Sequence, residues 1–222
     1  VLDGTGDYLS TNADSTLATK TYSFWMKSST TANNASCFGH GHVNKGAFHV
    51  NPGFTTGNAS KPIIYLNGSY YRYFDDVAAQ DDGNWHHWCV YIEHDDISEC
   101  LLWVDGVTVD PATTSDGDGA GLAYSTGLVI GGDGGSTSAN RFFLGNIDDF
   151  AVFDGKLTTA HALAIYNNGK PFDLNYNRGN YTVSGDLEGY WRMNHGSGAT
   201  VVDSSTNSNN GTLAADATFS TD

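Results

Sequence analysis

Short apolar segments that end at turn residues recur along the whole chain, and they limit what it can fold into. The clearest is Thr21–Ser28, in which Tyr22, Phe24 and Met26 alternate with side chains of the opposite face. A period of two places every second side chain on one face of a β-strand. The chain also contains 27 glycines, which is typical of tight turns between short strands. The sequence therefore predicts an all-β fold.

Further strands are expected wherever a short apolar segment is bounded by turn residues. These segments are Ala47–Asn51, Pro62–Leu66, Tyr70–Phe74, Trp85–Glu93, Cys100–Val104, Leu128–Gly131, Arg141–Gly145, Ile147–Phe153 and Leu187–Met193. One short helix is predicted near residues 158–168, because Leu163, Ile165 and Tyr166 follow a Thr cap at near-helical spacing. A length of 222 residues suits one large β-sandwich. We expect a single domain over residues 1–222.

The charge of the chain excludes some partners. The formal net charge is −15, from 25 acidic and 10 basic residues, so the surface should repel nucleic-acid phosphates and anionic lipids. No apolar segment approaches the length needed for membrane insertion. Of the 25 acids, 22 are Asp, whose short carboxylate serves both turns and hard-cation sites. We expect no nucleic acid partner and no membrane insertion, and calcium is a candidate cofactor.

Thiols and imidazoles carry less information about function. The three cysteines fit no metal-ligand spacing. Cys89 and Cys100 lie on neighbouring predicted strands, where they can form a disulfide or remain two buried thiols. The spacing of His40 and His42, with His49 nearby, can bind zinc, but no carboxylate or cysteine close in sequence completes the ligand set. We expect these histidines to be polar loop residues.

Three stretches, taken in order along the chain, carry a recognisable set of motifs. They are VLDGTGDYLS at Val1–Ser10, NWHHW at Asn84–Trp88 followed by LLWVDG at Leu101–Gly106, and FFLGNIDDFAVFDGKLTTAHALAIYNNGK at Phe142–Lys170. In this order they resemble the laminin-G-like family of concanavalin-A-like lectin and glucanase jelly rolls. The resemblance implies a jelly-roll sandwich of two antiparallel sheets.

The last motif, residues 187–214, is out of its usual order. The sequence LEGYWRMNHGSGATVVDSSTNSNNGTLA is similar to the segment that normally opens domains of this family, yet here it comes last. It resembles a circular permutation in which the segment closes its own domain, or a strand exchanged with a neighbouring subunit. Unpaired edge strands are a liability, so a partner is expected. Because the ends of a domain often lie close together, we expect closure within the same domain.

The resemblance implies a calcium site formed by two distant segments. Asp148 in the Ile-Asp strand would be one ligand, and the loop Asp203–Gly211 would supply oxygens from Asp203, Asn207 and Asn210. Ca²⁺ takes six to eight hard oxygens in flexible geometry, which an Asp- and Asn-rich loop facing a carboxylate can provide. The alternative is an Asx-turn loop without an ion. We expect any calcium bound there to be structural.

Two aspartates of the first motif have two possible roles. Asp3 and Asp7 flank the short sequence Gly-Thr-Gly, and they can either line a metal site or brace a tight turn. Asp side chains commonly accept hydrogen bonds from backbone amides in such turns. We favour turn bracing for both residues.

Signals for catalysis are missing from the sequence. Jelly-roll glucanases carry their paired carboxylates on a Glu-x-Asp-x-x-Glu strand, whereas the three glutamates here are dispersed as Glu93, Glu99 and Glu188. The chain has neither a Gly-x-Ser-x-Gly nucleophile elbow nor a phosphate-binding loop. We expect no enzymatic activity, although aspartates paired from distant loops leave a polysaccharide-active enzyme as an alternative.

Residues for binding a glycan are most concentrated in the sequence YYRY at residues 70–73. Sugar binding uses exposed aromatic faces with polar side chains that hold hydroxyl groups. Strand alternation puts Tyr71 and Tyr73 on one face, and Tyr70 and Arg72 on the other. We predict Tyr70 and Arg72 as the surface pair that binds a ligand; the alternative is that all four pack within the sheet.

The function that these observations favour is a non-catalytic binding or adhesion module, extracellular or on a virion surface. The run Ile165–Leu174 and the later Tyr-Trp-Arg-Met at residues 190–193 resemble laminin-G-like domains of phage and marine viral structural proteins, such as capsid decorations and tail fibres. The expected partners are a cell-surface glycan or other virion proteins, with a homo-oligomer possible. A structural assembly protein that exchanges its C-terminal strand is the alternative.

Overall fold

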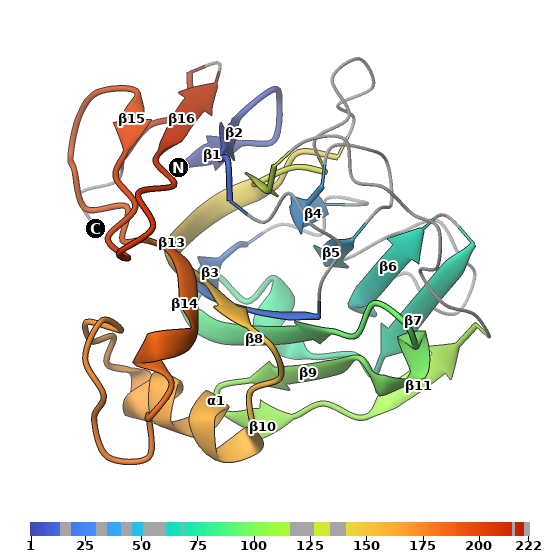
Figure 1. The fold of residues 1–222 in the computed structure, drawn as a ribbon. Coiled ribbons are helices and arrows are strands. Elements are labelled where there is room, and N and C mark those ends of the chain that lie inside the picture. The colour runs from blue at the N-terminus through green and yellow to red at the C-terminus, as the bar shows by residue number, and fades with distance from the viewer. Residues whose placement is uncertain are drawn as a thin grey trace.

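The computed structural model describes residues 1–13, 19–29, 35–40, 46–50, 61–67, 69–115, 127–133, 141–214 and 216–219. One α-helix, four short 3-10 helices and sixteen strands lie in these ranges (Figure 1). The strands are β1 Leu2–Asp3, β2 Tyr8–Ser10, β3 Lys20–Lys27, β4 Ala35–Gly39, β5 Ala47–Val50, β6 Ile63–Asn67, β7 Tyr70–Phe74, β8 His86–Ile92, β9 Leu101–Val104, β10 Val107–Thr108, β11 Pro111–Thr114, β12 Val129–Ile130, β13 Leu144–Asp154, β14 Leu187–Trp191, β15 Thr200–Val201 and β16 Gly211–Ala214. The helices are η1 Ala78–Gln80, η2 Ile97–Glu99, α1 Thr159–Tyr166, η3 Asn167–Gly169 and η4 Ser184–Asp186.

The strands form two antiparallel sheets. The first has the order β1-β13-β3-β8-β9-β10, with β14 also paired to β13. The second has the order β11-β7-β6-β5-β4-β12-β2-β16-β15. Figure 1 shows the sheets as two layers, with α1 and the loop after it at the lower end of β13 and β14. The predicted two-sheet antiparallel sandwich is confirmed.

The main core lies between the sheets and follows from the alternation in β3. Phe24 of β3 is fully buried and stacks on Phe150 of β13, with ring centroids 5.2 Å apart. Phe38 and Phe48 of the opposite sheet complete this aromatic group. Burial of a side chain of this size stabilises the fold by about 1.5–3 kcal/mol. The inward face of β3 therefore joins the two layers.

Helix α1 covers the outer face of the first sheet. Its N-terminus is capped by Thr158, whose Oγ1 accepts a hydrogen bond from the backbone N–H of His161, and it ends at Asn167 in the left-handed region with φ 47°. Ala162 and Ile165 are buried against the sheet. The helix predicted near residues 158–168 is confirmed at Thr159–Tyr166.

The C-terminal segment pairs with strands of the same chain in both sheets. Strand β14 pairs with β13, placing Tyr190 opposite Ala151. Strand β16 pairs with β2, placing Leu213 opposite Leu9. The first strands and the last strands consequently lie side by side, as Figure 1 shows.

The structure decides one open alternative and corrects one expectation about polar core residues. All three cysteines are buried free thiols, which excludes the disulfide between Cys89 and Cys100. His40 and His49 are fully buried rather than in polar loops. The hydroxyl group of Tyr22 lies 3.0 Å from Nε2 of His40, so this imidazole has a structural partner. His42 lies outside the described residues.

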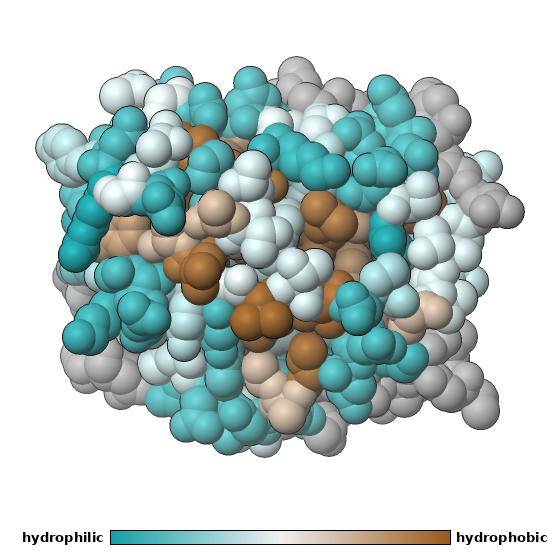
Figure 2. Space-filling view, turned by 90° about the horizontal axis from the view of Figure 1, so that it is seen from below, coloured by the Kyte–Doolittle hydropathy of each residue, from teal (hydrophilic) through white to brown (hydrophobic). Residues whose placement is uncertain are grey.

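The surface around α1 and β10 is mostly polar with separate apolar patches. Figure 2 shows this face, in which brown side chains are divided by white and teal ones. Val107 and Leu163 are exposed by 67% and 52%. Scattered exposure of this kind is ordinary for a monomer surface. Within the ranges that the structure describes, no helix combines the length and the apolar character needed to cross a membrane.

Candidate functional site

A groove lies at the end of the sandwich where the first and last segments of the chain meet. Its walls come from β1, the start of β13 and residues 217–219. We call it the terminal groove; its lining includes Leu2, Trp85, Asn146, Asp148, Met193 and Phe219. It combines apolar and aromatic side chains with a few polar groups, which is the usual composition of a ligand-binding cleft.

Trp85 is one of two aromatic side chains that line the groove, the other being Phe219. It immediately precedes β8 and remains half-buried, so part of the indole reaches solvent. The ammonium group of Lys27, from neighbouring strand β3, lies 5.9 Å from the centroid of the ring. An indole face beside a donor group can pack against a sugar ring and bind one of its hydroxyl groups.

Asp148 contributes a carboxyl group whose charge depends on its surroundings. It lies at an irregularity of β13, where the register with β3 shifts between Asp148 and Ala151 and Asp149 has φ 46°. Burial, and then the neighbouring carboxylate of Asp149, raise the pKa of Asp148 to about 6. The backbone N–H of Asp149 donates to Oδ1 of Asp148 at 2.9 Å. The groove therefore contains a carboxyl group whose pKa lies well above its ordinary value.

The loop Asp203–Gly211, which we call the bracing loop, is held by its own first residue. The Asp203 side chain is 5% exposed and accepts four hydrogen bonds. Oδ1 accepts from the backbone N–H groups of Tyr190 and Ser205, each at 2.8 Å. Oδ2 accepts from the Ser205 hydroxyl at 2.9 Å and from the Asn209 N–H at 2.7 Å. An ionised carboxylate has about four acceptor positions, and all four are used here.

The amide side chains of the bracing loop also bind the backbone. Asn207 Nδ2 donates to the carbonyls of Leu187 and Glu188 at 3.0 and 3.1 Å. Asn210 Oδ1 accepts from the backbone N–H of Asp203 at 3.0 Å. The role of these residues as calcium ligands, together with Asp148, stays a prediction. An ion at Asp203 would have to replace hydrogen bonds that now fasten the loop to β14.

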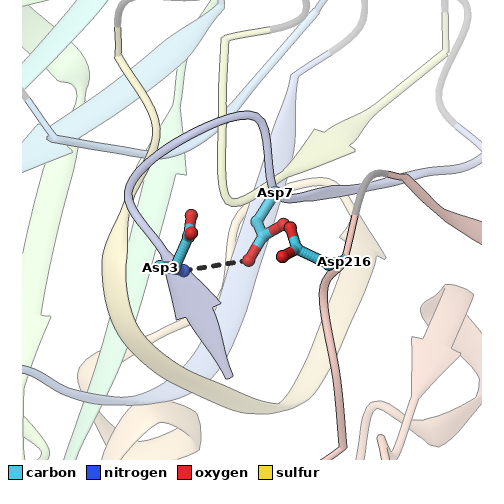
Figure 3. A group of neighbouring side chains, drawn as sticks. All are labelled: Asp3, Asp7 and Asp216. Carbon is cyan, nitrogen blue, oxygen red and sulfur yellow. Dashed lines mark hydrogen bonds between the residues drawn. The ribbon is translucent and has the colours of Figure 1, made fainter.

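A different group of carboxylates gathers beside the terminal groove. Asp3, Asp7 and Asp216 each offer one oxygen, and these atoms lie within 4.8 Å of one another (Figure 3). We call this group the acidic triad. Gly4 and Gly6 have φ of 80° and 89°, a conformation that glycine adopts readily. The turn between them folds back, so that the Asp3 N–H donates to Asp7 Oδ2 at 2.9 Å.

The acidic triad could hold a metal ion. Asp3 and Asp216 are exposed, whereas Asp7 is 2% exposed. Asp7 also braces the turn, as predicted from the sequence for this kind of motif. Asp216 was not singled out in the sequence, because nothing around it distinguishes it from the many other surface aspartates. The pairing of β16 with β2, and the hydrogen bonds between Val1 and Thr218, bring this part of the chain to Asp3 and Asp7.

Tyr70 and Arg72, the two residues of β7 predicted to bind a ligand, contact other parts of the protein. Arg72 is only 8% exposed, contrary to the expectation that it lies on the surface. Its Nη1 donates to the backbone carbonyls of Ile97 and Ser98 in η2. Tyr70 is half-buried and packs against the main core. Sequence alternation paired Tyr70 with Arg72 but put the pair on the wrong face, because Tyr70 packs against the main core whereas Tyr73 is buried in a separate cluster. The sequence also could not show that η2 covers Arg72.

Comparison with protein families identifies the fold family. A family model described as the concanavalin A-like lectin/glucanases superfamily matches residues 3–162, more than half of the chain. The chain belongs to this superfamily. A search among curated proteins found no matching sequence.

Solved structures with the superfamily fold include proteins described as binding carbohydrate. One is a Bacteroides ovatus protein provisionally described as carbohydrate binding, with 15% sequence identity and a TM-score of 0.65. The match covers 98% of this chain and 61% of that one. Another is domain 4 of an extracellular GH43 arabinanase from Geobacillus stearothermophilus, solved with arabinotriose. It shares 18% identity with a TM-score of 0.53, and the match covers 75% of each chain. At these identities the likeness shows the fold alone.

Proposed function

We propose that this chain is a non-catalytic module that binds glycans in the terminal groove. The observation that carries the proposal is the half-buried indole of Trp85 in a groove that also contains Asn146 and Asp148. An aromatic face supplies apolar contact with a sugar ring, and the amide and carboxyl groups accept or donate hydrogen bonds to its hydroxyl groups. The groove needs no catalytic group for this role.

The fold relatives support the same class of ligand. A carbohydrate-binding role is assigned provisionally to the Bacteroides ovatus protein, and the arabinanase domain was solved with an arabinose oligosaccharide. Because fold does not determine function, these relatives indicate which ligands to test first. Linear arabinan fragments and other plant and bacterial polysaccharides form the starting panel.

The setting of the module follows as part of the proposal. The extracellular arabinanase domain and the acidic charge of −15 fit a module displayed outside the cell. The resemblance to phage and marine viral structural proteins, and a homo-oligomeric state, stay predictions. So does the extent of the domain as one unit over residues 1–222.

The experiment is a binding screen followed by substitution of the indole. The chain is screened on a glycan array, and the best ligand is titrated by isothermal calorimetry. We expect Trp85→Ala to weaken binding at least tenfold without lowering the melting temperature by more than a few degrees. Tyr176→Ala is the matched control, because this aromatic side chain is 72% exposed and does not line the groove.

Two outcomes would overturn the proposal. One is the absence of binding to every glycan on the array. The other is equal affinity of Trp85→Ala and the unmodified chain, which would place any glycan elsewhere. Tyr70→Ala then tests the site predicted on β7.

A further inference from the structure

One carboxylate oxygen at the junction of the chain ends lacks a hydrogen-bond partner. Oδ1 of Asp7 is fully buried and accepts no hydrogen bond from the described residues, although Oδ2 accepts from Asp3. Asp7 as a whole is only 2% exposed. A buried charged oxygen without a partner costs several kcal/mol unless something else satisfies it. Figure 3 shows that the Asp7 carboxylate faces that of Asp216.

The two neighbours of Asp7 add negative charge and do not satisfy its buried oxygen. Asp3 and Asp216 are carboxylates too, and ionised carboxylates accept hydrogen bonds but donate none. Among the described residues, no lysine, arginine or histidine forms an ion pair with any member of the acidic triad. Burial, together with the charges of Asp3 and Asp216, raises the pKa of Asp7. Three carboxyl groups thus converge without an ion-pair partner in the part of the chain that the structure describes.

Other carboxylates of the molecule show what is missing here. Asp149 accepts a hydrogen bond from the Tyr190 hydroxyl at 2.7 Å and has the Arg192 guanidinium 3.9 Å away. Asp154 is paired with the buried ammonium group of Lys20 at 2.9 Å. Among the described residues, the acidic triad has neither kind of partner to balance its charge.

We propose that Asp3, Asp7 and Asp216 bind one calcium ion, which fastens residues 216–219 to the β1–β2 turn. The donor set consists of oxygen atoms only, which selects a hard cation. Calcium tolerates irregular geometry and completes its shell with carbonyl oxygens and water, whereas magnesium demands near-ideal octahedral geometry. The ligands come from the β1–β2 turn and from a C-terminal segment far away in the sequence. Such a site suits calcium, the ion that tolerates irregular geometry.

The ion would also shape the terminal groove. Ala217, Thr218 and Phe219 follow Asp216 directly and form one wall of the groove. Thr218 is attached to Val1 by two hydrogen bonds: its N–H donates to the Val1 carbonyl at 3.3 Å, and the Val1 ammonium donates to its carbonyl. An ion at Asp216 adds a stronger attachment next to this wall. Calcium should therefore increase glycan affinity, and this second half of the inference rests on the proposed function.

The test measures calcium binding directly and without a glycan. The chain is treated with EDTA, dialysed into metal-free buffer at pH 7, and titrated with CaCl₂ by isothermal calorimetry. We expect one site per chain, with affinity lowered at least tenfold in Asp7→Asn and in Asp216→Asn. Asp110→Asn is the matched control, because Asp110 is exposed and lies outside the triad. The melting temperature of each variant without calcium shows that it is folded.

The outcomes separate the ion site from the glycan site. No calcium binding by the unmodified chain, or equal binding by Asp216→Asn, overturns the calcium site whatever the glycan screen shows. Calcium binding with unchanged glycan affinity overturns the link to the groove alone. If the chain binds calcium at the triad but binds no glycan, the proposed function is wrong and the calcium site is supported.

Discussion

The bracing loop and the acidic triad use the same residue type in opposite ways. In the bracing loop one buried carboxylate, Asp203, receives four hydrogen bonds from amides and a hydroxyl group of its own surroundings. In the triad the buried carboxylate of Asp7 receives one, and two further carboxylates lie beside it. Both regions combine Asp with Gly, Ser and Thr, so the presence of aspartate among turn residues does not distinguish them.

The difference shows what a cation site requires beyond acidic residues. An ion competes with hydrogen bonds that the protein already makes, so a carboxylate whose acceptor positions are filled gains little from a metal. A carboxylate with an unsatisfied buried oxygen gains the full electrostatic attraction. On this reasoning the stabilisation by Asp203 should be independent of calcium, and the stabilisation involving Asp216 should depend on it.

The largest effect is expected from removing the bracing carboxylate. Asp203→Ala leaves the buried N–H of Tyr190 and the partly buried N–H of Asn209 without acceptors, and each such group costs about 1–3 kcal/mol. We expect the free energy of unfolding to fall by about 3 kcal/mol or more, equally with calcium and with EDTA. Urea denaturation under both conditions measures it. A loss seen only with calcium would show that Asp203 is a ligand after all.

Calcium removal should have the next largest effect, and only through the triad. At a free concentration 100 times its dissociation constant, a bound ion stabilises the native state by about 2.7 kcal/mol. For a chain of this length that corresponds to roughly 5–10 °C in melting temperature. We expect chelation to lower the melting temperature of the unmodified chain by this amount and to leave Asp216→Asn unchanged. Thermal unfolding followed by circular dichroism measures both, and an equal shift in the two proteins would contradict the comparison.

The substitution Asp148→Asn tests whether Asp148 is a metal ligand, because the two possible roles predict stability changes of opposite sign. The folded pKa of about 6 lies above the ordinary value near 4, so the native state binds the extra proton and stability falls as pH rises between these values. The cost is complete above pH 6. We expect Asn to stabilise the chain by about 1–2 kcal/mol at pH 7.5, allowing for partial exposure, and to have little effect at pH 4. Destabilisation at pH 7.5 that appears only with calcium would instead support the predicted ligand role.

The smallest effect is expected at His86, whose imidazole contacts the carboxylates of Asp82 and Asp105. Burial lowers the pKa of His86, but hydrogen bonds to Asp105 and Asp82 outweigh it and raise the pKa overall. This stabilisation is present below the unfolded pKa near 6.5 and is lost as pH rises through the folded pKa. We expect His86→Gln to cost about 0.5–1 kcal/mol at pH 5.5 and almost nothing at pH 9. Urea denaturation at the two pH values tests this, and a loss of equal size at both would assign His86 a packing role.

The sandwich could be predicted from the sequence because its signals are local. The alternation of Tyr22, Phe24 and Met26 sets the inward face of β3, and the Thr158 cap sets the start of α1. The acidic triad could not be predicted, because Asp216 meets Asp3 through the pairing of distant strands. The burial of Arg72 could not be predicted either, because its carbonyl partners come from residues 97 and 98, which are distant in the sequence.

The pairing of β16 with β2 has a consequence for how the chain folds. Ser10 and Thr212, which meet across these strands, are 202 positions apart in the sequence. Contacts this distant form late, because a long loop must close before they stabilise anything. During synthesis this edge of β2 stays open until residues 211–214 have left the ribosome. Over that interval the β16 strand of a second molecule competes for the same edge, so slow release or high local concentration should favour domain-swapped dimers.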